Sequence, residues 1–275
     1  MSKLKYIFQE KKMLIIIISI ILVCSIAIAF GVYAQITDKG TSKKEKEEEE
    51  NINYEDLKNN FQEIFTDSIN KETTAKLEFN YDELLYLKYD IEEEKLGKYN
   101  ITAKIPGFRE NTETLKKINQ EIYDVFAREI LKIAADSSTN STFNLDYAGY
   151  VNNNIISLAI MCKYKKGANA QRRIVQTYNY DIENDRLLTI EDLIQYKNLE
   201  KKDVQEKINK TIKDENSKSK TIIEQGFNVY VRDEASEVYE VENTPNFFLG
   251  KNNYLYLVYA YGNNNYTDVI DLVIF

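Results

Sequence analysis

The chain of 275 residues has no histidine and no tryptophan, and it contains 2 prolines and 2 cysteines. Without histidine it lacks the commonest metal ligand and the usual general base near neutral pH. A Ser-His-Asp triad and a histidine-ligated zinc site are therefore excluded within this sequence. Cys24 lies in a long apolar run, and Cys162 is the one cysteine outside that run. We therefore expect no intrachain disulfide.

Sequence motifs of the common enzyme classes are also missing. The chain has no glycine-rich phosphate loop and no Gly-x-Ser-x-Gly turn. The chain has 44 aspartates and glutamates, so two carboxylates that lie close in sequence are no evidence of a catalytic pair. We therefore expect a protein that is not an enzyme and that needs no metal and no cofactor.

Charge is unevenly distributed along the chain. The formal net charge is −8, and the first twelve residues carry four lysines and one glutamate, which leaves −11 for the remainder. Nucleic-acid binding needs a concentrated basic surface, so we exclude nucleic acid as a partner.

The longest hydrophobic run, residues 13–34, contains no charged residue. A helix of this length would measure about 33 Å, enough to cross a membrane. The preceding lysines predict a cytoplasmic tail at residues 1–12, a single transmembrane helix at 13–36, and a remainder that lies outside the cell. A cleaved signal peptide is the alternative, because Val32 and Ala34 resemble a cleavage site, but its apolar region usually spans about 7–15 residues.

The rest of the chain divides into a linker and a folded domain. Residues 37–51 are charged and of low complexity, which is typical of a solvated linker. In residues 52–275, helical spacing of apolar residues predicts helices over 54–69, 115–133 and 204–212, the last followed by a loop at 216–220. Alternating apolar residues predict strands over 77–81, 85–91, 99–105, 156–164, 174–182, 254–261 and 267–275. We expect an α+β domain, an antiparallel sheet with helices packed on it.

Two threonines and one cysteine are expected to serve this fold. Thr112 and Thr189 precede helical patterns and are suited to cap them. Cys162 shares a strand face with Ile160 and Tyr164, so we expect a buried thiol rather than a reactive one. Both faces of residues 254–261 are apolar, as in an interior strand.

Two segments, taken in order, resemble one known family. Residues 99–126 read YNITAKIPGFRENTETLKKINQEIYDVF, and residues 150–194 include a Gly-Ala loop, "YNYD" and "LTIEDL". They are similar to the extracytoplasmic domains of the PdaC/RsiV-like family. Those domains form the non-catalytic part of a peptidoglycan deacetylase and the lysozyme-sensing part of an anti-sigma factor. The resemblance covers residues 75–275 and implies a binding domain, with a lysozyme-like protein as one partner.

The sequence departs from that family in its central loop and at its ends. Family members often carry Gly-Gly-Ala-His where this chain has Lys166-Gly167-Ala168-Asn169. The twelve residues before the apolar run are too few for a folded sigma-factor inhibitor, and no deacetylase domain follows. The resemblance therefore implies a tethered binding domain without the family's known effector.

One segment has acidic and hydroxyl residues at the spacing of a calcium-binding loop. These residues are Asp181, Glu183, Asp185, Thr189 and Asp192. Arg186 replaces the glycine of such a loop, and its last position holds aspartate where a bidentate glutamate is needed. We interpret the segment as a solvated hairpin followed by a helix cap.

The candidate partner-binding residues lie in a turn near the end of the chain. Tyr261 and Tyr266 flank it, and it contains Asn263 and Asn264. Loops carry binding more often than strands do, and we expect exposed rings with free side-chain amides beside them. The alternative is that both rings pack under the hairpin.

Lys165 and Lys166 belong to the one dense basic cluster of an acidic domain, with Lys163, Arg172 and Arg173. The functional interpretation is a site for an anionic cell-wall polymer, and the alternative is a solvated strand end.

These observations favour a membrane-anchored extracytoplasmic domain that binds a lysozyme-like protein or a cell-wall polymer. Two alternatives stay open: a cell-wall-modifying enzyme, hydrolase or deacetylase-related, that uses carboxylates alone, and a structural protein of the envelope.

Overall fold

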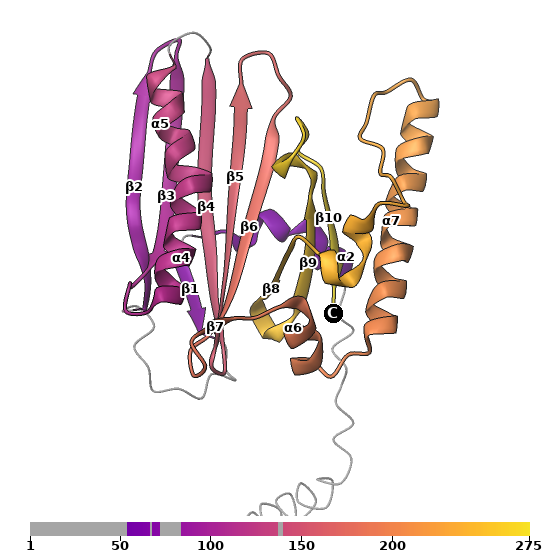
Figure 1. Cartoon of the computed structure of the whole chain (residues 1–275). Helices are drawn as coiled ribbons and strands as arrows, with labels where there is room; N and C mark the ends of the chain where they lie inside the picture. Colours follow the sequence, from indigo (N-terminus) through magenta and orange to yellow (C-terminus); the bar gives the residue numbers. More distant parts are fainter. Residues whose placement is uncertain (1–53, 67, 72–83, 137–139) are drawn as a thin grey trace, which may run out of the picture. The chain divides into compact units, whose positions relative to one another are not determined.

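The computed structural model describes residues 54–66, 68–71, 84–136 and 140–275. These residues form two β-sheets with helices packed on them (Figure 1). The strands of the first sheet are β1 (Ser68–Lys71), β2 (Leu85–Lys95), β3 (Tyr99–Phe108), β4 (Ser141–Asn152), β5 (Ile155–Lys166), β6 (Arg172–Asp181) and β7 (Arg186–Leu187). Those of the second are β8 (Asn246–Leu249), β9 (Leu255–Ala260) and β10 (Ile270–Ile274). The first sheet has the order β2-β3-β4-β5-β6-β7, with β1 paired to β4, and the second has the order β10-β9-β8.

The first sheet is mixed, which corrects the expectation of an antiparallel one. Strands β1 and β3 both run parallel to β4, and the other neighbours are antiparallel. Two adjacent parallel strands need a crossover between them. Here α4 (Glu113–Ile122), a π-helical turn (Tyr123–Ala127) and α5 (Arg128–Ala135) connect β3 to β4. The α+β class is confirmed.

The crossover helix covers one face of the first sheet. Thr112 caps α4 by accepting a hydrogen bond from the backbone of Leu115, as expected. The helix expected over 115–133 is confirmed, and its apolar side chains meet those of β3, β4 and β5 in one core, in which Cys162 is fully buried. Burial raises the pKa of the Cys162 thiol.

The opposite face of the first sheet packs against the second sheet. Their shared core includes Phe248, whose ring stacks on Tyr256 with centroids 4.8 Å apart. Strand β9 is buried along its whole length between β8 and β10, which confirms the prediction of an interior strand. The helix α2 (Tyr54–Asn59) is followed by a 3-10 turn, η1 (Phe61–Ile64). Phe61 in this turn and Phe65 directly after it are buried in the same core.

The expected helix over 54–69 is therefore shorter than predicted. It ends at Asn59, and Ile69 lies in β1, where the backbone pairs with β4. Backbone groups satisfied by a sheet have no need of helical partners.

A third core lies between the second sheet and the helices that follow β7, α6 (Ile190–Tyr196) and α7 (Lys201–Glu224). Helix α7 buries Val204, Ile208 and Ile212, as its spacing predicts. It then continues through residues 216–220, where a loop was expected. The polar residues Asn216 and Ser219 are buried there and bonded to the segment after the helix, so the apolar pattern alone did not reveal the helix.

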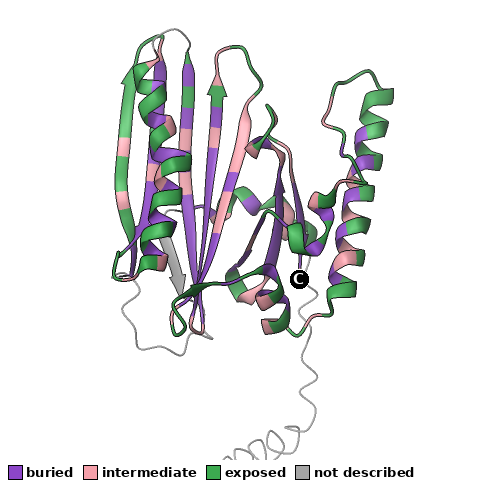
Figure 2. Ribbon diagram, in the orientation of Figure 1, coloured by how far each residue is buried: buried purple, intermediate pink, exposed green. Residues whose placement is uncertain are grey.

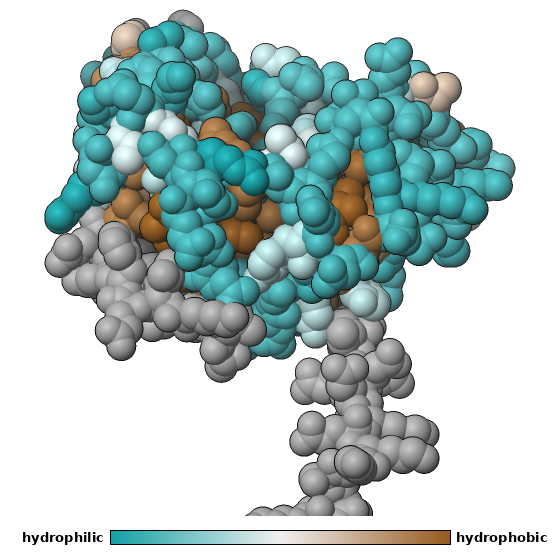
Figure 3. Space-filling model, turned by 60° about the horizontal axis from the view of Figure 1, so that its bottom comes forward, coloured by the Kyte–Doolittle hydropathy of each residue, from teal (hydrophilic) through white to brown (hydrophobic). Residues whose placement is uncertain are grey.

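The remaining described elements are 3-10 turns, η3 (Glu237–Tyr239), η4 (Val241–Asn243), η5 (Lys251–Asn253) and η6 (Tyr261–Asn263). Figure 2 shows the buried residues running along β3 to β6 and β9, while β2 and the outer sides of the helices are exposed. In Figure 3, hydrophilic residues dominate one face of the molecule, and hydrophobic ones show through in recesses between them.

None of the helices in the described part of the chain is long and apolar enough to cross a membrane. The transmembrane helix expected at 13–36, the linker at 37–51 and the strand expected at 77–81 all lie outside the described residues.

Candidate functional site

Three loops that are far apart in the sequence meet at a groove of about 610 Å³. They are the β5–β6 loop, the segment after α7 and the connection from β9 to β10. The groove is lined by Ala170, Gln171, residues 228–231 and residues 266–269. Ligand pockets usually measure about 300–1,000 Å³, and loops held by a rigid scaffold often carry binding.

Large side chains are exposed on the groove, at Val231 and Tyr266, and at Phe227, which precedes the lining residues 228–231 in the sequence. Phe227 is 64% exposed, Val231 is 50% exposed and Tyr266 is 57% exposed. The guanidinium of Arg172 lies 5.7 Å from the centre of the Tyr266 ring. Exposed aromatic and aliphatic groups that gather in one place are typical of interaction sites.

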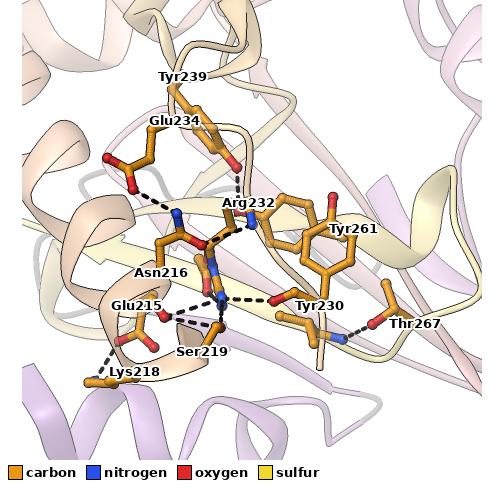
Figure 4. A network of polar contacts seen from close by, with 12 residues as sticks. Glu215, Asn216, Lys218, Ser219, Tyr230, Arg232, Glu234, Tyr239, Tyr261 and Thr267 are labelled. Atoms are coloured by element: carbon orange, nitrogen blue, oxygen red, sulfur yellow. Dashed lines mark hydrogen bonds and ion pairs between the residues drawn. The ribbon is translucent and has the colours of Figure 1, made fainter. Parts of the chain in front are cut away.

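One buried arginine holds a wall of the groove in place (Figure 4). Arg232 follows the wall residues 228–231, and its guanidinium donates to both carboxylate oxygens of Asp271 on β10, at 2.6 and 2.7 Å. It also donates to Ser219 Oγ on α7 at 2.6 Å. The backbone N–H of Arg232 donates to Asn216 Oδ1 at 3.2 Å. The wall is thereby anchored to both a strand and a helix.

Tyr261 belongs to the same network. Its hydroxyl donates to Asp271 Oδ2 at 2.7 Å and lies 2.8 Å from the hydroxyl of Tyr239. Burial, and then the negative charge of Asp271, raise the pKa of Tyr261, so its hydroxyl stays protonated as a donor. Its ring packs on Tyr230, a groove residue, with centroids 4.5 Å apart. Tyr261 therefore supports the groove from behind.

The same carboxylate fixes the charge of Arg232. Burial acts to lower the pKa of the guanidinium, but its hydrogen bonds to Asp271 and the negative charge of that residue raise it overall. The guanidinium of Arg232 is therefore charged throughout the physiological range.

The asparagine-rich turn divides into a structural half and an exposed half. The side-chain amide of Asn263 accepts a hydrogen bond from Val175 N at 2.9 Å and donates one to Val175 O at 2.8 Å. We expected this amide to be free, but it satisfies the backbone of β6 instead. At Gly262 an added Cβ would lie 2.3 Å from Arg173 O, so the turn needs glycine for this close approach. Asn264 and Tyr266 are exposed.

The basic cluster is divided between two faces of the sheet. Successive strand residues point to opposite faces, so Lys165 and Lys166 do not share a surface. Lys165 is exposed, and Lys166 forms an ion pair with Asp136 at 3.1 Å. Arg172 donates to the carbonyl oxygens of Gly262 and Asn263, both at 2.7 Å. The structure thus does not bring this cluster together as one site.

The segment with calcium-like spacing holds its own polar groups. The Asp181 carboxylate accepts hydrogen bonds from the backbone of Glu183 and from the backbone and side chain of Asn184. Asp192 pairs with Arg186 and completes a capping box with Thr189. These bonds support the interpretation as a hairpin and cap. Within the described residues, no cluster of three or more acidic, cysteine or histidine side chains is placed to hold a metal ion.

Sequence reasoning missed Arg232 and the segment before it. One signal was present, because Asp271 is the single charged residue in an otherwise apolar strand, Ile270–Ile274. A carboxylate at such a position needs a partner when it is buried. The sequence does not show which of its 36 basic residues supplies that partner.

The described residues define a two-sheet α+β domain with a loop-built groove. No protein-family model matches the sequence, and no curated protein matches it. Among solved structures it is similar to a DUF3298 family protein from Pseudomonas aeruginosa PAO1, with 14% identity and a TM-score of 0.38, over 69% of this chain and 85% of that chain. The resemblance to PdaC/RsiV-like domains stays a prediction from the sequence.

Proposed function

We propose that the protein is a single-pass membrane protein whose folded domain lies outside the cell and captures another protein at the three-loop groove. The observation that carries this proposal is the exposure of two large side chains that line that groove, Val231 and Tyr266. Rigid aromatic anchors that become buried in a complex supply most of the energy of many interfaces.

The charge of the domain favours a cationic partner. The chain beyond its first twelve residues carries a net charge of −11, which speeds encounter with a positively charged protein. A lysozyme-like protein has that charge, and the resemblance described above suggests the same partner.

A cell-wall glycan is the second candidate ligand. The groove combines the rings of Tyr230 and Tyr266 with the amides of Gln171 and Asn228. Flat rings together with amide donors and acceptors suit the apolar and hydroxyl faces of sugars.

The carboxylate content of the groove supports binding over hydrolysis. Glycoside hydrolysis uses two carboxyl groups, about 5–9.5 Å apart across the substrate. Among the residues that line the groove, Asp268 is the one carboxylic acid, and it lies 3.7 Å from Arg173.

Binding to the full chain in lipid nanodiscs tests the proposal. The ligands are a purified cationic lysozyme and soluble glycan fragments of peptidoglycan. Tyr266→Ala and Val231→Ala should each weaken capture about tenfold or more without lowering the melting temperature. Leu131→Ala is the matched control, because Leu131 is 58% exposed on α5, and it should leave capture unchanged.

Each result has one interpretation. Capture of lysozyme that depends on the groove residues supports a protein receptor, and capture of glycan alone supports the second candidate. If the wild-type chain captures neither ligand, or if Leu131→Ala reduces capture as much as the groove variants do, the proposal is wrong and a purely structural envelope role is favoured.

A further inference from the structure

Among the strands that the structure describes, β2 forms an edge of the first sheet. It has 11 residues and lies at the end of the strand order, and no described strand pairs with its outer side. Hydrogen-bonded residues alternate along an antiparallel strand, so every second residue of β2 directs its N–H and C=O outward. Such an edge is a template for an added strand.

Leu85 is buried and Lys88 and Ile91 are half-buried, and the other side chains of β2 are exposed, on both faces of the strand. Figure 2 shows β2 largely exposed, in contrast to its neighbour β3. Tyr86, Leu87 and Tyr89 are 38–40% exposed, and an acidic run follows them. The pairing with β3 is irregular between Leu87 and Tyr89 and then continuous to Lys95, so the acidic half of the edge is the regular half.

The acidic side chains are ordered along this edge. Asp90, Glu92 and Glu94 alternate, so they share one face of the sheet, opposite Lys104, Thr102 and Asn100 of β3. All three acidic side chains are exposed. A strand added beside them would place every second side chain next to one of these carboxylates.

We propose that the outer edge of β2 takes up an extended, cationic segment of another protein as an additional strand. The outward backbone groups supply the hydrogen bonds of β-augmentation, and the carboxylates select segments with lysine or arginine at alternating positions. The same charges discourage pairing with acidic strands.

This surface is independent of the proposed groove. In the strand order, β2 and β6 are separated by β3, β4 and β5, and the groove adjoins the β6 side of the sheet (Figure 1). Loss of binding at one surface therefore leaves the other in place.

The test uses the full chain in nanodiscs and a synthetic peptide of alternating lysine and valine. This peptide should bind and should slow amide hydrogen exchange in β2. Two further peptides serve as probes: the same sequence with alternate backbone nitrogens methylated, and an alternating glutamate and valine peptide. Neither should bind, because the first lacks the backbone donors and the second carries the wrong charge.

Two double variants test the charges. Glu92→Gln with Glu94→Gln should weaken binding of the lysine peptide about fivefold, as expected for two exposed charge pairs. Glu206→Gln with Glu224→Gln removes the same charge from α7 and should leave the affinity unchanged.

Several results overturn the proposal. Failure of the lysine peptide to bind overturns it, as does a methylated peptide that binds as tightly. The proposal is also wrong if both double variants weaken binding equally, or if the lysine peptide slows amide exchange outside β2 instead of within it. The proposal is also overturned if the full chain forms dimers and the double variant Glu92→Gln with Glu94→Gln does not. In that case a second copy of the chain would occupy the edge.

Discussion

Arg232 and Asp271 form a bidentate ion pair across 39 residues of sequence, with side chains that are 5% and 2% exposed. Because both charges are removed from water, each needs the other to offset its lost hydration. The pair joins the segment after α7 to β10, so the position of a groove wall depends on it.

Removal of the arginine should therefore destabilise the whole domain. Arg232→Met leaves the Asp271 carboxylate buried without its main partner, and we expect a loss of about 3–5 kcal/mol in the free energy of unfolding. Denaturant titration of the full chain in detergent measures it. Arg128→Met is the control, because Arg128 pairs with Asp124 on the surface and should change stability by about 1 kcal/mol or less. Equal losses in the two variants would contradict the structural role of the buried pair.

The two tyrosines of the last turn should behave differently. Tyr261→Phe removes a donor to Asp271 and a partner of Tyr239, and should lower stability by about 1–3 kcal/mol. Tyr266→Ala removes a ring that is 57% exposed and should change stability by about 0.5 kcal/mol or less. Melting temperatures of the two variants measure the difference. Similar losses in both would mean that both rings support the fold.

Local patterns were enough to predict much of this fold. The apolar spacing of residues 115–133 and the caps Thr112 and Thr189 appear in the structure as expected. The interior position of residues 255–260 follows from two apolar faces, since an edge or a half-covered strand would carry a polar face.

The missed features depend on contacts between distant residues. The second half of α7 has polar buried residues, and their partner Arg232 lies beyond the helix, so the 3.6-residue pattern fades at Asn216. The parallel pairing of β3 with β4 depends on the crossover path, which alternation within one strand does not record. Asn263 serves the backbone of β6 across 88 residues, a role that no local turn rule predicts.

The Asp192 carboxylate should titrate well below its ordinary range. Hydrogen bonds from Arg186, followed by those from Thr189, lower its pKa to about 2. Because this value lies below the unfolded value of about 3.9, the stabilisation is fully present above about pH 4 and is lost as the pH falls through about 2. Carboxyl carbon chemical shifts followed by NMR measure the titration. In Arg186→Gln the pKa of Asp192 should rise toward its ordinary value, and an unchanged titration would contradict the assigned cause.

Chelation should leave the folded domain intact. The Asp181 oxygens are occupied by nitrogen donors from residues 183 and 184, and Asp192 by Arg186 and Thr189, so the calcium-like spacing offers no open ligand set. We expect the same melting temperature of the full chain with and without EDTA. A large loss in EDTA that calcium restores would revive a metal site in this segment.

The membrane topology can be tested directly on cells. The uncharged run at residues 13–34 and the lysines before it predict that everything beyond the linker faces outward. Protease added to intact cells without an outer barrier should therefore digest the folded domain and leave a short anchored remnant. A cytoplasmic protein of known location serves as the control for cell integrity.

Two results of that experiment would change the assignment. Protection of all residues beyond Asn51 would place the domain inside the cell, against the charge bias of the tail. A mature chain that begins at Gln35 would show that the apolar run is a cleaved signal peptide, so the domain would be secreted. The expected remnant includes residues 13–36, because an uncleaved helix of that length shields its backbone within the hydrocarbon region, where protease has no access.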